Sequence, residues 1–295
     1  MRIIQSVATN LFFPASRKDA AAFGRSAAFL RDLGVKSMEF YCDGPDAAQV
    51  GKHLRDNGMR GVYIAVIPLK EKLLHLCGVD EDNRRQAVSL AKGAMEEAQR
   101  LGAATVMFNS GRIAEGQVEE GLEALYRSFT ELFEHKAKKG LAVALELEPC
   151  DSAMDARQLL GPIARTGAFV KRLHNGGMPL MLTLDSAHTS EEGESFAEAL
   201  TTLRPYCNHI HFANCRISDP QDALYGDKHL GYEYADSVWT YDAIRDFLPV
   251  LEKLYPGQQE LTIGLEALCR EDDAYTYFQK TAARLPELFN QRETK

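Results

Sequence analysis

Four short apolar segments of the sequence end in a side chain that can bind a metal ion or move a proton. They are LAVALELE with Glu146 and Glu148, LMLTLD with Asp185, HIHFAN with His211, and LTIGLEA with Glu266. Carboxylates and an imidazole brought to one point would repel one another unless a cation neutralised them. A set of oxygen and nitrogen donors of this kind suits Mn, Mg, Co or Zn. The pattern therefore predicts one divalent metal ion at the ends of these segments.

Two of the segments carry a second candidate on the same face. Successive side chains of a strand point to opposite sides, so Glu146 and Glu148 share one face, as do His209 and His211. The alternation leaves open which member of each pair lies at the depth of Asp185. A single Glu at a strand end is more often a solvated surface group, and a single His in an apolar strand is more often a core residue. Four such residues on four consecutive strands favour a site.

The elements that must position these residues alternate along the whole chain. Short β-rich segments alternate with longer segments of helical periodicity, such as 82–101, where Ala and Leu recur at steps of three and four residues. The expected strands are 3–9, 37–42, 61–67, 105–109, 141–148, 180–185, 209–214 and 261–267. Strands joined through helices run parallel, and nearly continuous apolar strands indicate burial on both faces.

Eight such βα units predict a (β/α)8 TIM barrel of the α/β class, with residues 1–295 as a single domain. A doubly wound open sheet is the alternative. Its usual nucleotide fingerprints, G-x-G-x-x-G and the P-loop motif, are missing from the sequence. In a barrel of this kind the active site lies at the carboxyl ends of the strands, where the four polar residues occur.

Composition narrows the range of partners. The chain has 295 residues, 45% of them hydrophobic and 26% charged, with a formal net charge of −8. That charge argues against a nucleic-acid partner, which would require clustered Lys and Arg, and favours a small molecule. The sequence shows neither a signal peptide nor an apolar stretch long enough for a membrane span, which predicts no membrane partner and a cytoplasmic location. The six Cys residues are scattered singly, which indicates free thiols.

A long segment without helix or strand character, from about Cys215 to Val238, follows the seventh expected strand. A loop of this length in a compact domain is often functional. It contains the D-x-H motif of Asp227 and His229. Two interpretations of this motif stay open: hydrogen bonding within the loop, or a contact with the substrate.

The motifs resemble those of the xylose-isomerase-like barrels. The resemblance rests on the G-x5-E from Gly140 to Glu146, the D-x-x-H of Asp185 and His188, the H-x-H ending in His211, and the late Glu266. Within that superfamily the chain is similar to the sugar isomerase/epimerase branch, near the ketose 3-epimerases. The similarity extends from about residue 1 to residue 290.

This resemblance implies a set of roles. Glu146, Asp185, His211 and Glu266 would bind one divalent metal ion, most often Mn²⁺, with Mg²⁺, Co²⁺ or Zn²⁺ as alternatives. His188 and Arg216 would contact a sugar substrate. Asp227 and His229 of the loop motif are further candidates for a substrate contact, outside what the resemblance implies. Glu146 and Glu266 would act as the acid/base pair that inverts C3 of a ketose through an enediolate. Barrels of this branch often form dimers or tetramers, so a homo-oligomer is expected.

Four other functions are alternatives to this one. An aldose–ketose isomerase would use the same ligands and the same enediolate. A lyase would begin with the same enolisation and then expel a leaving group. An endonuclease IV-like zinc nuclease would use Asp227 and His229 as extra ligands, but the expected strands 61–67 and 105–109 lack the His ligands of that branch. A non-catalytic assembly subunit would be expected to lack at least one ligand.

Overall fold

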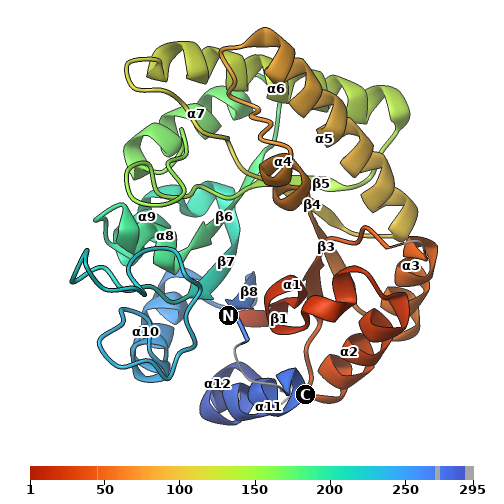
Figure 1. The fold of residues 1–295 in the computed structure, drawn as a ribbon, viewed down its shortest axis with the longest axis vertical. Coiled ribbons are helices and arrows are strands. Elements are labelled where there is room, and N and C mark those ends of the chain that lie inside the picture. Colours follow the sequence, from red (N-terminus) through yellow and green to blue (C-terminus); the bar gives the residue numbers. More distant parts are fainter. Residues whose placement is uncertain (45, 270–272, 290–295) are drawn as a thin grey trace. The chain divides into compact units, whose positions relative to one another are not determined.

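The computed structural model of the protein describes residues 1–44, 46–269 and 273–289. Its eight strands form a closed barrel in the order β1 to β8. The pairings of β1 with β2 and β8, of β4 with β3 and β5, of β5 with β6 and of β7 with β8 are parallel. Figure 1 labels the elements. The strands are β1 (Arg2–Ala8), β2 (Ser37–Phe40), β3 (Arg60–Ile64), β4 (Thr105–Phe108), β5 (Ala144–Leu147), β6 (Met181–Asp185), β7 (Cys207–Ala213) and β8 (Glu260–Glu266). The predicted TIM-barrel fold is confirmed, and each strand overlaps its expected range. The third expected strand, 61–67, is too long, because β3 ends at Ile64 and α4 begins at Val66.

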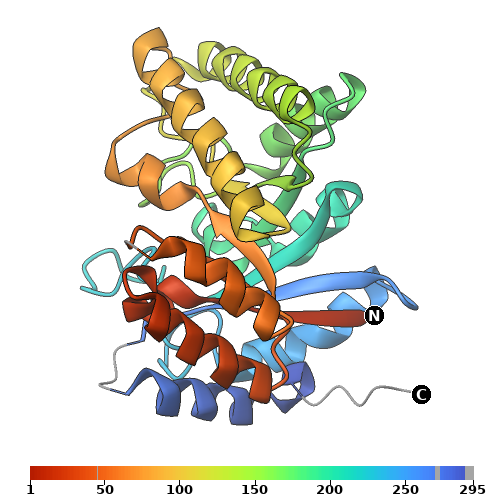
Figure 2. The ribbon, with the colours of Figure 1, turned by 90° about the vertical axis from the view of Figure 1, so that its right-hand side faces the viewer.

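The chain groups into two compact units, each of which is described by itself. The first comprises Met1–Gly61 and Asn208–Lys295, so it joins the two ends of the sequence. Within it, β1 and β8 run side by side in parallel (Figure 2). Its helices are α1 (Thr9–Phe12), the 3₁₀ turn η1 (Pro14–Arg17), α2 (Ala20–Asp32), α3 (Ala47–Asp56), α10 (Tyr241–Leu254), α11 (Ala274–Arg284) and α12 (Pro286–Phe289).

The second unit comprises Val62–Cys207. Its helices are α4 (Val66–Glu71), α5 (Glu81–Leu101), α6 (Val118–Lys139), α7 (Ile163–Asn175), α8 (Ser186–Glu191), α9 (Phe196–Leu203) and the 3₁₀ turn η2 (Arg204–Tyr206). The single-domain boundary of 1–295 stays a prediction. None of the described helices is both long and apolar enough to cross a membrane.

Local sequence explains where the long helices begin and end. Helix α5 begins after Asp80, whose carboxylate accepts a hydrogen bond from the amide of Asp82, and it ends at Gly102 with φ +76°. Helix α6 ends in the same way at Gly140, with φ +62°. Glycine adopts this left-handed conformation without the cost that a β-carbon brings, so each helix stops just before the next strand.

Aromatic residues next to the strand ends pack into the core. Phe40 contacts Phe23 of α2, and Phe108 contacts Phe129 of α6. Both strand residues are completely buried. These side chains therefore point away from the barrel axis toward the helices, as the alternation of side chains along a strand requires.

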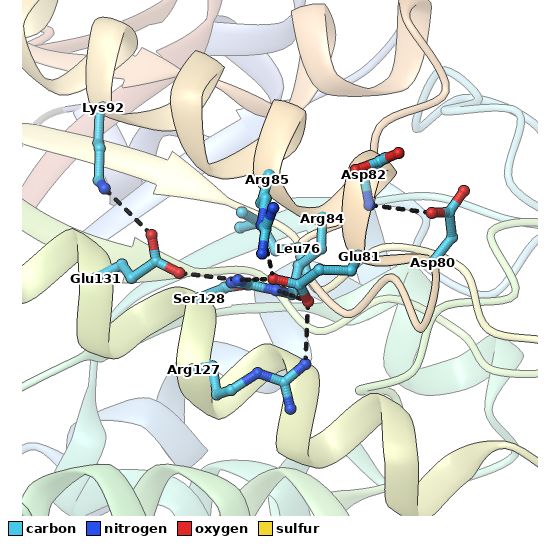
Figure 3. Close-up of polar contacts among 10 residues, drawn as sticks. All are labelled: Leu76, Asp80, Glu81, Asp82, Arg84, Arg85, Lys92, Arg127, Ser128 and Glu131. Carbon is cyan, nitrogen blue, oxygen red and sulfur yellow. Dashed lines mark hydrogen bonds and ion pairs between the residues drawn. The ribbon is translucent and has the colours of Figure 1, made fainter.

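A network of charges ties α5 to α6 within the second unit (Figure 3). Arg84, whose side chain is only 4% exposed, donates to both carboxylate oxygens of Glu81, at 2.7 and 2.9 Å, and to Glu131 at 2.9 Å. It also donates to the Ser128 hydroxyl, which in turn donates to the carbonyl of Leu76. The hydrogen bonds from Arg84 lower the pKa of the Glu81 carboxyl to about 2.

Replacing Arg84 with Ala is expected to lower the free energy of unfolding by about 2 kcal/mol, because the buried arginine stem and its charge-assisted hydrogen bonds are lost together. The matched control is Arg85→Ala on the same helix, because Arg85 is exposed and also contacts Glu81; its effect should stay below about 0.5 kcal/mol. Urea unfolding measures the free energy of unfolding of both variants.

The effect of Arg84 on stability should also depend on pH. A carboxyl with a lowered pKa, such as that of Glu81, stabilises the protein at neutral pH and loses that effect as the pH falls toward 2. The difference between wild type and Arg84→Ala should therefore narrow below pH 4.5; equal effects of the two variants at neutral pH would contradict this account.

Candidate metal centre

The carboxyl ends of β5 and β6 bring two carboxylates together within the second unit. Glu148 and Asp185 are both buried, and each offers an oxygen within 4.8 Å of the other. Glu146 lies one inward position deeper, where its Oε2 accepts a 3.0 Å hydrogen bond from the hydroxyl of Thr183. Thr183 precedes Asp185 by two residues on the same face of β6, just as Glu146 on β5 precedes Glu148, which directly follows that strand. The geometry therefore pairs Asp185 with Glu148, whereas the count from Gly140 favoured Glu146.

The D-x-x-H motif has a structural explanation. Asp185 is the N-cap of α8, and its Oδ1 accepts a 2.8 Å hydrogen bond from the amide of His188. The spacing of three residues is the one that an N-cap requires. The ring of His188 is buried, with Nδ1 3.3 Å from Glu191, and it offers a ligand atom within 4.8 Å of Glu148 and Cys150.

The first unit holds the imidazole and the carboxylate predicted on β7 and β8. Nδ1 of His211 lies 2.8 Å from Oε2 of Glu266. His211 is opposite Gly264 in the register of the two strands, so Glu266 projects one inward position nearer the carboxyl end. His211 is 1% exposed at its side chain and Glu266 15%, so the two side chains meet where solvent is nearly excluded.

Glu39 on β2 is a buried partner that the sequence interpretation missed. Its Oε2 lies 2.7 Å from Nε2 of His211, and its Oε1 lies 3.2 Å from Nε2 of His209. Gly264 leaves the room for this contact, because a β-carbon there would come within 2.5 Å of Glu39 and 2.6 Å of His211. Burial disfavours the charged form of Glu39, but the two imidazoles outweigh burial and hold its pKa well below the usual range. The Glu39 carboxylate is thus a buried anion in direct contact with His211.

The D-x-H motif of the long loop reaches Glu266. Nδ1 of His229 lies 2.8 Å from Asp227, and Nε2 lies 3.4 Å from Oε1 of Glu266. Burial disfavours the charged imidazole, but Asp227 and Glu266 outweigh it and raise the pKa of His229 well above its usual range. Burial also opposes ionisation of Glu266, yet His211 and His229 together keep its pKa below the usual range. Glu266 is therefore a carboxylate held between two imidazoles.

Arg216 braces the same loop. It donates to Asp222 at 2.8 Å and to the carbonyl of Ala235 at 2.7 Å. Both bonds lie within the segment between β7 and α10, so in this structure Arg216 orders the loop. Its expected contact with a substrate stays a prediction.

The surroundings of His211 provide a test of whether a cation fits. Both ring nitrogens face carboxylates, Glu39 at Nε2 and Glu266 at Nδ1. Ionised carboxylates only accept hydrogen bonds, so the ring satisfies both only as a doubly protonated imidazolium or with a cation in place of one proton. Glu266 and Nδ1 lie on the side of the strand ends, and carboxylate with imidazole is a donor set that divalent ions accept. The residues fit a metal ion at Nδ1, with Nε2 held by Glu39.

Known proteins share this fold. The chain has a TM-score of 0.68 and 17% identity to a solved D-tagatose 3-epimerase-like protein, with 99% of each chain covered. It has a TM-score of 0.65 and 18% identity to an L-ribulose 3-epimerase, with 98% of each covered. For the IOLI protein, solved with a bound zinc atom, the values are 0.67 and 14%, with 100% of each covered. No curated protein matches the sequence.

A family model described as the xylose isomerase-like TIM barrel matches residues 27–234. The match covers more than half of the chain and includes β2 with Glu39, β5, β6 and β7. Together with the solved neighbours it supports an isomerase-type enzyme. The chain belongs to the xylose isomerase-like TIM barrel family.

Proposed function

We propose that this protein is a divalent-metal-dependent sugar isomerase/epimerase, and that its reaction is the 3-epimerisation of a ketose. The observation that carries the proposal is His211, whose two ring nitrogens face Glu39 and Glu266 at 2.7 and 2.8 Å. A structural histidine would need one such partner. Two carboxylates on opposite nitrogens are expected where one fixes the ring and the other shares a cation with it.

The proposed ligands are Glu148, Asp185, His211 and Glu266, one from the end of each of the strands β5 to β8. Each half of this set is supported within its own unit, by the nearby oxygens of Glu148 and Asp185 and by the 2.8 Å contact of His211 with Glu266. Glu148 replaces the initially favoured Glu146 for the reason of depth given above. Three carboxylates and one imidazole suit Mn²⁺, with Mg²⁺, Co²⁺ or Zn²⁺ as alternatives. When bound, such an ion polarises a carbonyl and the hydroxyl next to it.

Two of the proposed ligands would also transfer protons, and two histidines would support the reaction. Glu148 and Glu266 are the proposed acid/base pair: one removes the C3 proton of the ketose and the other returns a proton to the opposite face. His229 is held by Asp227 and faces Glu266, so it keeps that carboxylate ionised. His188, fixed by its backbone bond to Asp185, is the proposed contact to a sugar hydroxyl.

The test combines metal analysis with a substrate screen. Protein purified without added metal is expected to contain about one Mn, Co or Mg ion per chain. With Mn²⁺ it should convert free ketoses to their C3 epimers. The control is Asp185→Asn, because Asn still caps α8 but lacks the charge. This variant should fold, bind metal weakly and show no turnover.

Other outcomes would contradict the proposal in different ways. A chain that binds no metal would refute the metal centre. A content of about three zinc ions would indicate a zinc nuclease. One metal ion with aldose products would indicate an aldose–ketose isomerase, and cleavage products from a sugar derivative would indicate a lyase on the same barrel.

A further inference from the structure

The segment His229–Tyr232 of the long loop lies between the carboxyl ends of β7 and β8. On one side, the amide of Leu230 donates to the carbonyl of Asn214, directly after β7, at 3.0 Å. On the other side, the amide of Leu268, after β8, donates to the carbonyl of His229 at 2.7 Å. The segment is therefore bonded to both strand ends of the first unit.

The side chain of Tyr232 bonds to the backbone of both strands. Its hydroxyl donates to the carbonyl of Phe212 on β7 at 2.6 Å and accepts from the amide of Glu266 on β8 at 2.9 Å. The register pairs Phe212 with Leu265, which makes the Phe212 carbonyl and the Glu266 amide neighbours across the ladder. The phenol bonds to both groups and is 1% exposed.

A second anchor holds the loop independently. The side-chain amide of Asn214 donates to the carbonyl of Gly231 at 3.0 Å and to the Ser237 hydroxyl at 2.8 Å, and its oxygen accepts from the amide of Trp239 at 2.7 Å. These bonds order the loop without contacting Glu266. The loop and the backbone of Glu266 can therefore be perturbed separately.

We propose that Tyr232 is a positioning residue for Glu266, which it fixes through the Glu266 backbone amide. The same loop segment brings His229 to within 3.4 Å of the carboxylate, so Glu266 is held at its amide and at its side chain by one segment. This inference rests on the proposed function, in which Glu266 is both a ligand and a proton carrier. Loss of the Tyr232 hydroxyl leaves the aromatic ring in place but removes the hydrogen bond to the Glu266 amide, which fixes the backbone that positions the carboxylate.

The experiment compares Tyr232→Phe with Tyr241→Phe. The second variant removes a neighbouring hydroxyl, which lies 3.2 Å from that of Thr281, and keeps the ring that packs against Tyr232. In the metal-free protein, hydrogen exchange should accelerate about tenfold or more at the Glu266 amide in Tyr232→Phe and stay unchanged in Tyr241→Phe. Calorimetric titration should show Mn²⁺ affinity weaker by about tenfold in Tyr232→Phe only. At saturating Mn²⁺, kcat for the ketose should fall while KM stays near the wild-type value.

A third variant, Asn214→Ala, separates the hydroxyl from loop order. It should loosen the loop and lower the melting temperature, yet keep Mn²⁺ affinity closer to wild type than Tyr232→Phe does. Equal Mn²⁺ affinity in wild type and Tyr232→Phe, or a loss in Asn214→Ala as large as that in Tyr232→Phe, would overturn the inference. If the wild-type protein itself binds no Mn²⁺, the proposed function fails, and the role of Tyr232 fails with it.

Discussion

Glu148→Gln is expected to weaken Mn²⁺ binding and reduce turnover, each by about a thousandfold, because it removes one negative ligand and one of the two proton carriers. Glu146→Gln is expected to keep metal binding within about threefold of wild type, because its side-chain oxygen can still accept the hydrogen bond from Thr183. The two substitutions are chemically identical and lie two residues apart, Glu146 within β5 and Glu148 directly after it. They differ only in depth along the barrel.

Metal affinity is measured by competition with a chelator, and turnover by the rate of C3 epimer formation at saturating Mn²⁺. Thermal unfolding of the metal-free variants shows whether either substitution disturbs the barrel. If Glu146→Gln loses the metal and Glu148→Gln keeps it, the initial assignment from the motif count was correct and the assignment by depth is wrong.

The fold was predictable because its signals are local and repeated. Short apolar strands recur eight times with segments of helical periodicity between them, and each of these patterns depends on neighbouring residues only. Each of the eight strands therefore overlaps its predicted range. A repeated βα unit leaves few alternatives to a closed barrel once the count reaches eight.

The depth of a residue within the barrel was not predictable in the same way. The alternation of side chains gives the face but repeats every two residues, so Glu146 and Glu148 are equivalent by pattern. Their difference follows from where β5 ends and from the stagger between β5 and β6, both of which are set by pairing with other strands. The contact of Glu146 with Thr183 reveals that stagger, and no local pattern contains it.

Glu39 shows a second limit. It lies in the buried segment Met38-Glu39-Phe40, where a charged residue among apolar ones should have indicated a partner. Gly264 was a further signal, because a glycine inside a buried strand indicates that another group approaches closely. Neither signal identifies His211 as the partner, since the contact joins residues 172 positions apart.

Glu39→Gln is expected to weaken Mn²⁺ affinity by about ten- to a hundredfold, even though Glu39 is not a proposed ligand. The carboxylate holds the proton on Nε2 of His211, so that Nδ1 faces Glu266 and the metal. A Gln side chain has nearly the same size but can present either its oxygen or its NH₂ group to the ring, so the orientation of the imidazole and the site of its proton are no longer fixed.

Proton release distinguishes this role from a loss of packing. In the wild type, Mn²⁺ binding should displace about one proton from Nδ1, measured by calorimetry in buffers of different ionisation enthalpy. In Glu39→Gln no anion faces Nε2 of His211, so a smaller fraction of the metal-free protein carries a proton on both ring nitrogens. Mn²⁺ binding should therefore release fewer protons from this variant than from the wild type. The matched control is Glu191→Gln, because Glu191 is also a buried glutamate paired with a histidine, His188, outside the proposed ligand set. Unchanged affinity and proton release in Glu39→Gln would show that His211 orients itself without Glu39.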